Sequence, residues 1–365
     1  MKACGIVTEY NPFHNGHIYH IQEARKISQC DCMIAVMSGN FVQRGQPAII
    51  DKWQRAQCCL QYGVDIVLEL PYPFATQSAD YFAQGAIDTL QLAGCECVVF
   101  GSESNDIDRL YRTLTEVEKR SSDKESSNAL LISKTAEKVH SNDILGVSYL
   151  KALQHTNMIP YTIQRTNAYH DLDHHQKIAS ASAIRHAIKH NEDVSHTTIM
   201  ADQLTTTHDF EAYYPYLQTL IMTSSSNHLK ELFLVDEGME QLFKKHISNH
   251  DTLASFVDAC ISKKYTRARI QRALVHILTQ TSKAEINALP KLEHIRVLAF
   301  NECGRQYLSQ LKHTSEVLIA SRFSQIPSAY RELELRATMA YVYPIALPLR
   351  KEAIAKEWQS QIYRP

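Results

Sequence analysis

The 365-residue chain lacks any run of about 18 apolar residues, so we expect no membrane-spanning helix. We also expect no secretion leader, because the apolar stretch 1–8 is short and is followed at once by Glu9 and Asn11. No internal repeat or low-complexity tract stands out. We therefore expect a cytoplasmic protein.

The chain also lacks an excess of charge of one sign, since it has 38 basic and 39 acidic side chains. This balance gives no general attraction to nucleic acid, so any RNA contact requires a local basic patch. The nine cysteines are odd in number and scattered, which favours reduced thiols over a disulfide framework. An apolar share of 44% and a charged share of 21% are typical of a globular protein, and the length allows two domains.

Two cysteine pairs raise the alternative of a zinc site. Cys30 with Cys32 and Cys95 with Cys97 each lead into a strand-like stretch, "MIAVMSG" and "VVFGSES". Structural zinc ligands are more often two to four residues apart. We favour buried positions in strands, because free cysteine behaves as a small hydrophobic residue. The His- and Asp-rich stretch 169–175, "YHDLDHH", lacks regular ligand spacing and is interpreted as a solvent-facing loop.

Strand and helix patterns alternate through the first hundred residues. The predicted strands are 2–8, 32–37, 65–70 and 97–101, and the predicted helices are 17–27, 51–63 and 78–94. Short, almost wholly apolar strands separated by helices indicate a parallel sheet that is covered on both faces. Such open α/β sheets bind ligands beyond the carboxyl ends of their strands.

The rest of the chain looks more helical. We expect a polar helical excursion over 102–141, a strand at 160–165 and a helix beginning near Ser182. Helical periodicity then dominates after residue 191, including the stretch 294–311. The fold class predicted is α/β: a Rossmann-like parallel-sheet domain over 1–190, followed by a mainly α-helical domain over 191–365.

Three polar motifs follow predicted strands and should converge on one crevice. They are "EYNPFHNGH", "SGNFVQRGQP" and "GSES". In the first, Pro12 fixes the loop and Gly16 lets the chain approach a ligand where a helix starts. Backbone N–H groups and the helix dipole favour a phosphate there, and His14 and His17 add donors. Donors of this kind suit cleavage between the α- and β-phosphates of a nucleotide.

A metal stripe formed by His14, His17 and His20 is the alternative, but the strand–turn–helix context favours phosphate. The segment resembles the His-x-Gly-His nucleotidyltransferase superfamily, whose small-molecule members typically carry Gly-x-Phe-Asp-Pro-x-His-x-Gly-His. Here Tyr10 and Asn11 replace the Phe and Asp, a departure from the common coenzyme adenylyltransferases.

The superfamily's second motif, Ile-Ser-x-x-x-Ile-Arg, is echoed by "IASASAIR". Ser180 and Ser182 supply hydroxyl caps for another helix N-terminus, and Arg185 supplies a guanidinium suited to triphosphate. A capped helix without a ligand is the alternative for this stretch when it is taken alone.

Longer blocks narrow the resemblance. "GIVTEYNPFHNGHIYH", "MSGNFVQRGQPAIIDKWQRA", "DIVLELPYPFATQSADYFAQGAI", "SNDILGVSYLKAL" and "SKKYTRARIQRALVHIL" look like the bacterial tRNA(Met) cytidine acetate ligase family. The resemblance implies that ATP and acetate form acetyl-adenylate with release of pyrophosphate. The acetyl group would then pass to N4 of the wobble cytidine of elongator tRNA(Met).

The resemblance also implies site residues. The catalytic set would be His14, His17, Ser182 and Arg185. The ATP-binding set would be Val7, Thr8, Glu9, Tyr10, Asn11, Pro12, Phe13, His14, Asn15, Gly16, His17, Ile18, Tyr19, His20, Gly101, Asn142 and Arg165. Mg²⁺ is chemically plausible beside a triphosphate, but the sequence predicts no dedicated metal site.

Two further groups are candidates for the acceptor side. One is a Gly-flanked loop that contains Asn40, Gln43 and Arg44. This loop could bind acetate or the incoming base, and the alternative is a plain exposed loop. A basic run suggests tRNA phosphate contacts or a solvated helix face: Lys263, Lys264, Arg267, Arg269 and Arg272. The alternative functions are AMP transfer onto a phosphorylated metabolite and nucleotide sensing without catalysis.

Overall fold

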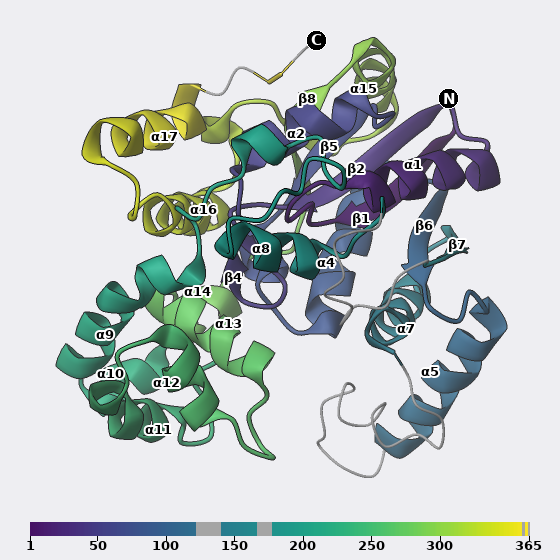
Figure 1. Ribbon diagram of the computed structural model, residues 1–365. Coiled ribbons are helices and arrows are strands. Elements are labelled where there is room, and N and C mark those ends of the chain that lie inside the picture. Colours follow the sequence, from purple (N-terminus) through teal and green to yellow (C-terminus); the bar gives the residue numbers. More distant parts are fainter. Residues whose placement is uncertain (122–139, 166–176, 360–361, 364–365) are drawn as a thin grey trace.

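The computed structural model describes residues 1–121, 140–165, 177–359 and 362–363 (Figure 1). Its centre is a seven-stranded sheet in the order β7-β6-β1-β2-β5-β8-β9. The strands are β1 (Ala3–Thr8), β2 (Cys32–Ser38), β5 (Ile66–Leu70), β6 (Cys97–Ser102), β7 (Ile159–Gln164), β8 (His294–Phe300) and β9 (Leu318–Ala320). All neighbours are parallel except β5 and β8. The predicted α/β class with a mostly parallel sheet is confirmed.

Helices cover both faces of this sheet. Those that pack directly on it are α1 (Asn15–Ser28), α2 (Lys52–Gln61), α4 (Ala79–Leu92), α7 (Ser141–Leu153) and α15 (Glu302–Thr314). The same part of the molecule also contains α3 (Tyr72–Ala75), α5 (Ile107–Ser121) and α8 (Ala181–Lys189). Alternate residues of β2 enter two different cores: Ile34 packs with α4 and α7, and Met33 packs with α1 and α2. Helix α4 approaches β1 closely at Gly5, where a Cβ atom would lie 2.4 Å from the side chain of Leu90.

A second body of helices has its own core and lies below the sheet in Figure 1. It comprises α9 (Tyr214–Thr223), α10 (Ser226–Glu231), α11 (Met239–His246), α12 (Leu253–Cys260), α13 (Arg267–Leu278) and α14 (Lys283–Asn287). Phe41 from the hairpin of β3 (Phe41–Val42) and β4 (Gln46–Pro47) joins this core, as does Tyr72. The last helices, α16 (Ser328–Tyr341) and α17 (Leu347–Gln359), return towards the sheet.

The expected helical periodicity over 294–311 is wrong for its first seven residues. They form β8, whose residues are all buried and which pairs antiparallel with β5. A short, fully buried strand that runs into a helix carries no alternation to distinguish it from a helix. The sheet therefore ends in strands from the last quarter of the chain, while the division into domains at residue 190 stays a prediction.

The cysteines are free thiols, and eight of the nine are buried. Cys32 lies in β2 and Cys97 in β6, as the strand interpretation predicts. The polar excursion contains α5, but residues 122–139 lie outside the described part, as does the whole stretch 169–175. Among the described residues, no helix combines the length and the apolarity needed to cross a membrane.

Candidate functional site

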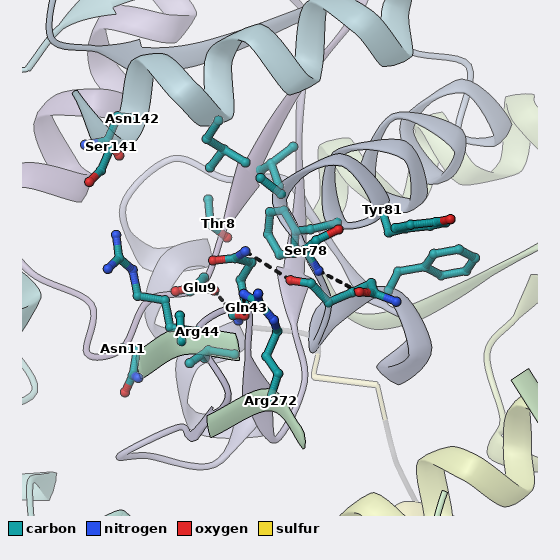
Figure 2. Close-up of a pocket in the computed structure, with 18 of the residues that line it drawn as sticks. Thr8, Glu9, Asn11, Gln43, Arg44, Ser78, Tyr81, Ser141, Asn142 and Arg272 are labelled. Carbon is teal, nitrogen blue, oxygen red and sulfur yellow. Dashed lines mark hydrogen bonds between the residues drawn. The ribbon is translucent and has the colours of Figure 1, made fainter. Parts of the chain in front are cut away.

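A large cleft opens at the carboxyl ends of β1, β6 and β7, with a volume of about 1460 Å³. Its walls also include the β3–β4 hairpin, the first residues of α4, α7 and α8, and one face of α13. Figure 2 shows Asn142 of α7, Tyr81 of α4 and Arg272 of α13 around Thr8 and Glu9 at the end of β1. The cleft thus brings together residues from all three motifs that follow the strands.

Most of the predicted site residues line this cleft. They are Val7, Thr8, Glu9, Tyr10, Asn11, His14, Gly16, His17, Tyr19, His20, Gln43, Arg44, Gly101, Asn142, Arg165, Ser182, Arg185, Lys263, Lys264, Arg269 and Arg272. Six predicted residues are absent from its lining, namely Pro12, Phe13, Asn15, Ile18, Asn40 and Arg267.

The residues outside the lining have structural contacts instead. Phe13 is fully buried in the core under α1. The Asn15 side-chain amide donates to the main-chain oxygens of Lys177 and His196, at 2.7 and 2.9 Å. Asn40 is buried and donates to the hydroxyl of Thr338 at 2.8 Å. The expectation that Asn40 forms part of the cleft rim is therefore corrected, because its amide faces α16.

His14 and His17 form a reciprocal cap at the start of α1. Nδ1 of His14 accepts the Gly16 N–H at 3.1 Å, and Nδ1 of His17 accepts the His14 N–H at 3.1 Å. The two rings lie with their centroids 3.8 Å apart. Because each Nδ1 is an acceptor, the neutral ring carries its proton on Nε2. Both imidazoles can therefore offer an Nε2–H to a ligand.

Glycine is required between these two histidines. A Cβ atom on Gly16 would lie 2.9 Å from Cε1 of His14 and 3.2 Å from the side chain of Ile178. The His-x-Gly-His spacing thus follows from the cap geometry: the ring of His14 occupies the space where a side chain at position 16 would stand.

Burial keeps these rings neutral. It lowers the pKa of His14 to about 3, with Arg165 and Arg185 adding to the effect. It also lowers the pKa of His17 well below the ordinary histidine value, and that of His20 to about 4. A polyphosphate beside these groups would oppose this shift, because a nearby negative charge favours the imidazolium form.

The first turn of α8 faces the same loop. Ser180 caps the helix by accepting the Ala183 N–H at 3.0 Å. Arg185, one turn further on, donates to the main-chain oxygen of Asn11 at 2.5 Å and to the hydroxyl of Ser182 at 3.4 Å. The guanidinium is thus held beside the His14 loop, where it is suited to contact phosphate oxygens.

On the opposite side, the start of α7 is tied to the loop after β6. Asp143 is buried and accepts the hydroxyl of Ser102 at 2.5 Å and the N–H of Glu103 at 3.0 Å. At Gly101 a Cβ atom would lie 3.0 Å from Cγ of Arg165. The absent side chain at Gly101 therefore leaves room for Arg165 along the cleft wall.

The strand ends and the hairpin are joined by one buried arginine. Arg55 of α2 donates to the main-chain oxygens of Glu9 at 2.5 Å, of Ser38 at 3.0 Å and of Gly39. The Glu9 carboxylate in turn accepts the N–H of Gln43 at 2.7 Å. Arg55 thereby fixes the ends of β1 and β2 relative to the hairpin.

The far end of the cleft is basic. Arg272 of α13 lies against the hairpin, and burial lowers its pKa to about 10. Lys264 and Arg269 both pair with Glu237, at 3.6 and 3.1 Å. Arg267 is exposed, pairs with Asp258 and is not part of the cleft wall.

Three polar residues of the site were not singled out from the sequence. Glu103 binds the start of α7 beside the cleft. The main-chain oxygen of Gln77 accepts the Gln43 side-chain amide at 3.0 Å, and Tyr81 is 62% exposed on the cleft wall. Glu103 belongs to the "GSES" motif, so its place after a strand was a usable signal. Gln77 and Tyr81 flank the start of a helix and carry no comparable signal.

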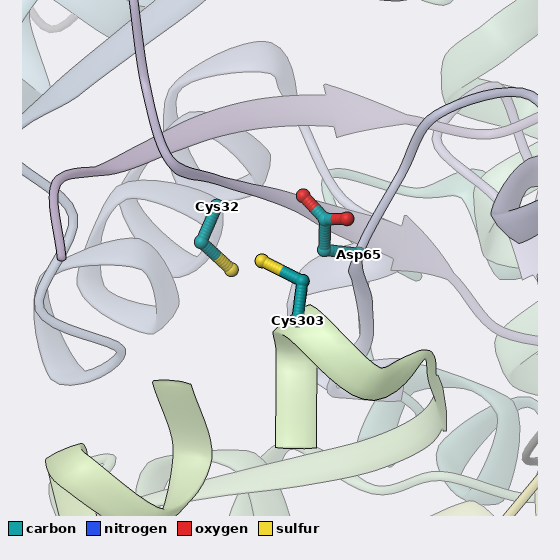
Figure 3. Close-up of side chains that lie close together, drawn as sticks. All are labelled: Cys32, Asp65 and Cys303. Atoms are coloured by element: carbon teal, nitrogen blue, oxygen red, sulfur yellow. The ribbon is translucent and has the colours of Figure 1, made fainter. Parts of the chain in front are cut away.

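A group of possible metal ligands lies outside the cleft. Cys32, Asp65 and Cys303 have ligand atoms within 4.8 Å of one another, with the two sulfur atoms turned towards each other (Figure 3). Both oxygens of Asp65 already accept hydrogen bonds, from Arg25, Asn301 and the Met33 N–H. Two thiols and an occupied carboxylate do not match the oxygen ligands that Mg²⁺ prefers.

Sequence comparisons agree with this geometry. A family model described as HIGH Nucleotidyl Transferase matches residues 1–356. The chain is 39% identical over 397 residues to the tRNA(Met) cytidine acetate ligase of Anoxybacillus flavithermus, covering 99% of each protein. It is 34% identical to the enzyme of the same name from Bacillus subtilis, covering 98% of this chain and 96% of that relative.

Solved structures give the same result. The chain superposes on apo Thermotoga maritima TmcAL with a TM-score of 0.89 and 29% identity, covering 100% of both chains. A second structure of that protein, bound with alpha-thio ATP, gives a TM-score of 0.84 and 30% identity over 96% of each chain. The chain therefore belongs to the tRNA(Met) cytidine acetate ligase family of HIGH nucleotidyl transferases.

Proposed function

We propose that this protein activates acetate with ATP and transfers the acetyl group to N4 of the wobble cytidine of elongator tRNA(Met). The observation that carries the proposal is the pair of neutral imidazoles at the start of α1, inside a cleft that continues to a basic end. A cleft of about 1460 Å³ exceeds the roughly 300–1,000 Å³ that small ligands need. This size favours a macromolecular acceptor over a phosphorylated metabolite.

For the first step, ATP is assigned to the end of the cleft between α1, α7 and α8. Three buried polar atoms in its wall, Thr8 Oγ1, Tyr10 OH and His20 Nε2, have no partner among the described residues. Such atoms support a polar ligand, because buried polar groups are normally hydrogen-bonded. Asn142 and Arg165 complete the ATP-binding set on the side of β6 and α7.

The chemistry requires little from the protein beyond placement and charge stabilisation. An acetate oxygen attacks the α-phosphorus, and the bond to the β-phosphate oxygen breaks. The Nε2–H groups of His14 and His17 donate to the phosphate oxygens as negative charge develops, while Ser182 and Arg185 retain the pyrophosphate. The protein need not form a covalent acyl intermediate, so the buried cysteines need no catalytic role.

The acceptor is assigned to the other end of the cleft. Arg44, Arg272 and Lys263 supply positive charge for RNA phosphates. Tyr81 offers an exposed aromatic face on which an unstacked base can lie, as is common in the recognition of single-stranded RNA. Because the proposed acceptor is a tRNA, we also propose that the protein acts in the cytoplasm.

The test is ATP–pyrophosphate exchange by the purified protein, with and without acetate and without RNA. We expect exchange that depends on acetate and falls at least about 100-fold in His17→Ala. Acetylation of a tRNA(Met) transcript, followed by nuclease digestion and mass spectrometry, identifies the acceptor atom. Absence of acetate-dependent exchange, with and without the tRNA, would rule out the proposed activity.

A further inference from the structure

Three carboxylates of the described residues line the cleft, and two of them have other contacts. Glu237 pairs with Lys264 and Arg269 at its basic end. Asp88 lies in the second half of α4 and accepts a hydrogen bond from Gln84 at 2.8 Å. Neither of these carboxylates lies in the loop that carries the two histidines.

Glu9, the third, follows the last residue of β1 and stands five positions before His14. Its Oε1 accepts the Gln43 N–H at 2.7 Å, and its Oε2 accepts no hydrogen bond from the described residues. Figure 2 shows Glu9 beside Gln43, with Thr8 and Arg44 around it. Glu9 therefore lies between the end assigned to ATP and the hairpin wall assigned to the acceptor.

The transfer step needs a proton acceptor. The exocyclic amine of cytosine must lose one proton when it becomes an amide. His14 and His17 are unsuited to take it, because each Nδ1 already accepts a backbone N–H and each Nε2 already carries a proton. Protonating either Nδ1 would remove a hydrogen bond that forms the start of α1.

We infer that Glu9 is the catalytic base of the transfer step, an inference that rests on the proposed function. The N4 lone pair forms a bond to the acetyl carbon, and the bond from that carbon to the AMP phosphate oxygen breaks. The electron pair of the broken bond leaves with AMP, and the N4 proton passes to Oε2 of Glu9 and then to solvent. The products are N4-acetylcytidine, AMP and a proton.

The surroundings of Glu9 suit this role. Burial raises the pKa of its carboxyl group, while Arg44, Arg185 and Arg55 act to lower it. Tyr149 of α7 lines the same cleft, and burial together with the charge of Glu9 raises the pKa of its hydroxyl group. A carboxylate with a raised pKa is a stronger base than an exposed one, and perturbed groups of this kind are typical of catalytic clefts.

The test separates transfer from activation. The protein is incubated with ATP and labelled acetate until pyrophosphate release stops, and a tRNA(Met) transcript is then added for a single turnover. A parallel sample receives hydroxylamine, which converts acetyl-adenylate to a hydroxamate and so counts it. Glu9→Gln is the matched variant, because its amide oxygen can still accept the Gln43 N–H.

We expect the ratio of the transfer rate constant to the hydroxamate yield to fall about 100-fold or more in Glu9→Gln. Glu9→Asp, which keeps a carboxylate, should recover part of the loss. The wild-type transfer rate should rise with pH to a plateau as Glu9 ionises, and the Glu9→Gln rate should not.

Two results would overturn the inference while leaving the proposed function intact. One is an unchanged ratio, in which hydroxamate and transfer fall together because Glu9 serves only the binding of ATP. The other is a wild-type transfer rate that does not depend on pH. If wild-type protein yielded no acetate-dependent hydroxamate, the proposed function would fail together with the inference.

Discussion

Glu103 and Asn142 are joined by two hydrogen bonds to the same carboxylate oxygen. Oε1 of Glu103 accepts the side-chain amide of Asn142 at 2.6 Å and its main-chain N–H at 3.2 Å. Oε2 accepts the N–H of Asp143 at 2.9 Å, so the carboxylate caps α7. One N–H of the Asn142 amide is thereby used, and its orientation in the cleft is set by a residue of the neighbouring loop.

Replacing Glu103 by alanine should therefore weaken nucleotide binding. We expect the KM for ATP in acetate-dependent pyrophosphate exchange to rise about tenfold, because a lost charged hydrogen bond costs on the order of 1.5 kcal/mol. Glu116→Ala, on the exposed face of α5, is the matched control. An unchanged KM in Glu103→Ala would show that Asn142 does not need this partner.

Gly16→Ala should lower the rate of acetate activation. The added Cβ would lie 2.9 Å from the ring of His14 and would displace it from its cap. Because misplacing a catalytic group by about 1 Å costs on the order of 100-fold, we expect exchange to fall by roughly that factor. The unfolding temperature, measured in parallel, separates this effect from a general loss of stability. Wild-type exchange in Gly16→Ala would contradict the role given to the cap.

Arg272 and Arg267 provide a matched pair for the acceptor end. Arg272 lines the cleft, and its buried Nε has no partner among the described residues, whereas Arg267 lies outside the cleft and pairs with Asp258. We expect Arg272→Ala to weaken tRNA binding. The slope of the logarithm of the binding constant against the logarithm of salt concentration should become shallower by about one, as for the loss of one phosphate contact. Arg267→Ala should change neither quantity. Equal effects of the two substitutions, measured by filter binding across salt concentrations, would contradict this assignment.

His294 should make the protein less stable in acid. Burial and the neighbouring Arg296 lower its folded-state pKa to about 4 from an ordinary value of 6.5. Between these values the unfolded chain binds more protons, so the contribution is present above pH 6.5 and is lost as the pH falls towards 4. His294→Leu should therefore reduce the loss of unfolding free energy between pH 7 and 5 by about 1 to 2 kcal/mol.

Urea denaturation at the two pH values gives the measurement for this variant. Other groups, such as the buried carboxyl of Glu334 whose raised pKa acts in the opposite direction, cancel in the difference between variant and wild type. An identical pH dependence in both proteins would mean that His294 does not contribute.

The first half of the fold was accessible from the sequence because its signals are local. The strand before Glu9 and the helix after His14 follow from an apolar run and a glycine-containing turn, and the ends of parallel strands meet at one edge. The reciprocal cap between the histidines is local too, but it was not predicted, since Gly16 was interpreted as the place where a ligand approaches the chain. The predicted strand, turn and helix fixed the place of the cleft, and family resemblance supplied the ATP-site residues predicted in its wall. Other lining residues, such as Tyr149 and Tyr330, were not predicted.

What the sequence did not provide depends on distant partners. Asn40 stands in the right loop, but its amide is turned to Thr338, almost 300 positions later. Residues 294–300 become a strand because β5 has an open edge, which no local pattern near His294 records. In the same way, Tyr81 is exposed on a cleft wall only because α4 packs where it does.

A buried ring of four charges couples the end of the chain to the sheet. Lys52 of α2 donates to Glu69 of β5 at 2.7 Å and pairs with Glu357 of α17 at 2.8 Å. Arg296 of β8 binds the same two carboxylates at 2.6 Å each. All four side chains are at most 5% exposed. A truncation near residue 195 would leave Lys52 and Glu69 without two partners and β5 without β8, so it should yield unfolded protein.

A single substitution gives a sharper test of this ring. Glu357→Gln leaves two buried cations facing one carboxylate, and breaking a buried pair in this way typically costs about 3–5 kcal/mol. Glu352→Gln, on the exposed side of the same helix, should change the free energy of unfolding by less than about 0.5 kcal/mol. Adding Lys52→Met to Glu357→Gln restores charge balance around Arg296 and Glu69 and should recover part of the loss. Equal urea midpoints for the two single variants would show that the ring does not anchor α17 to the sheet.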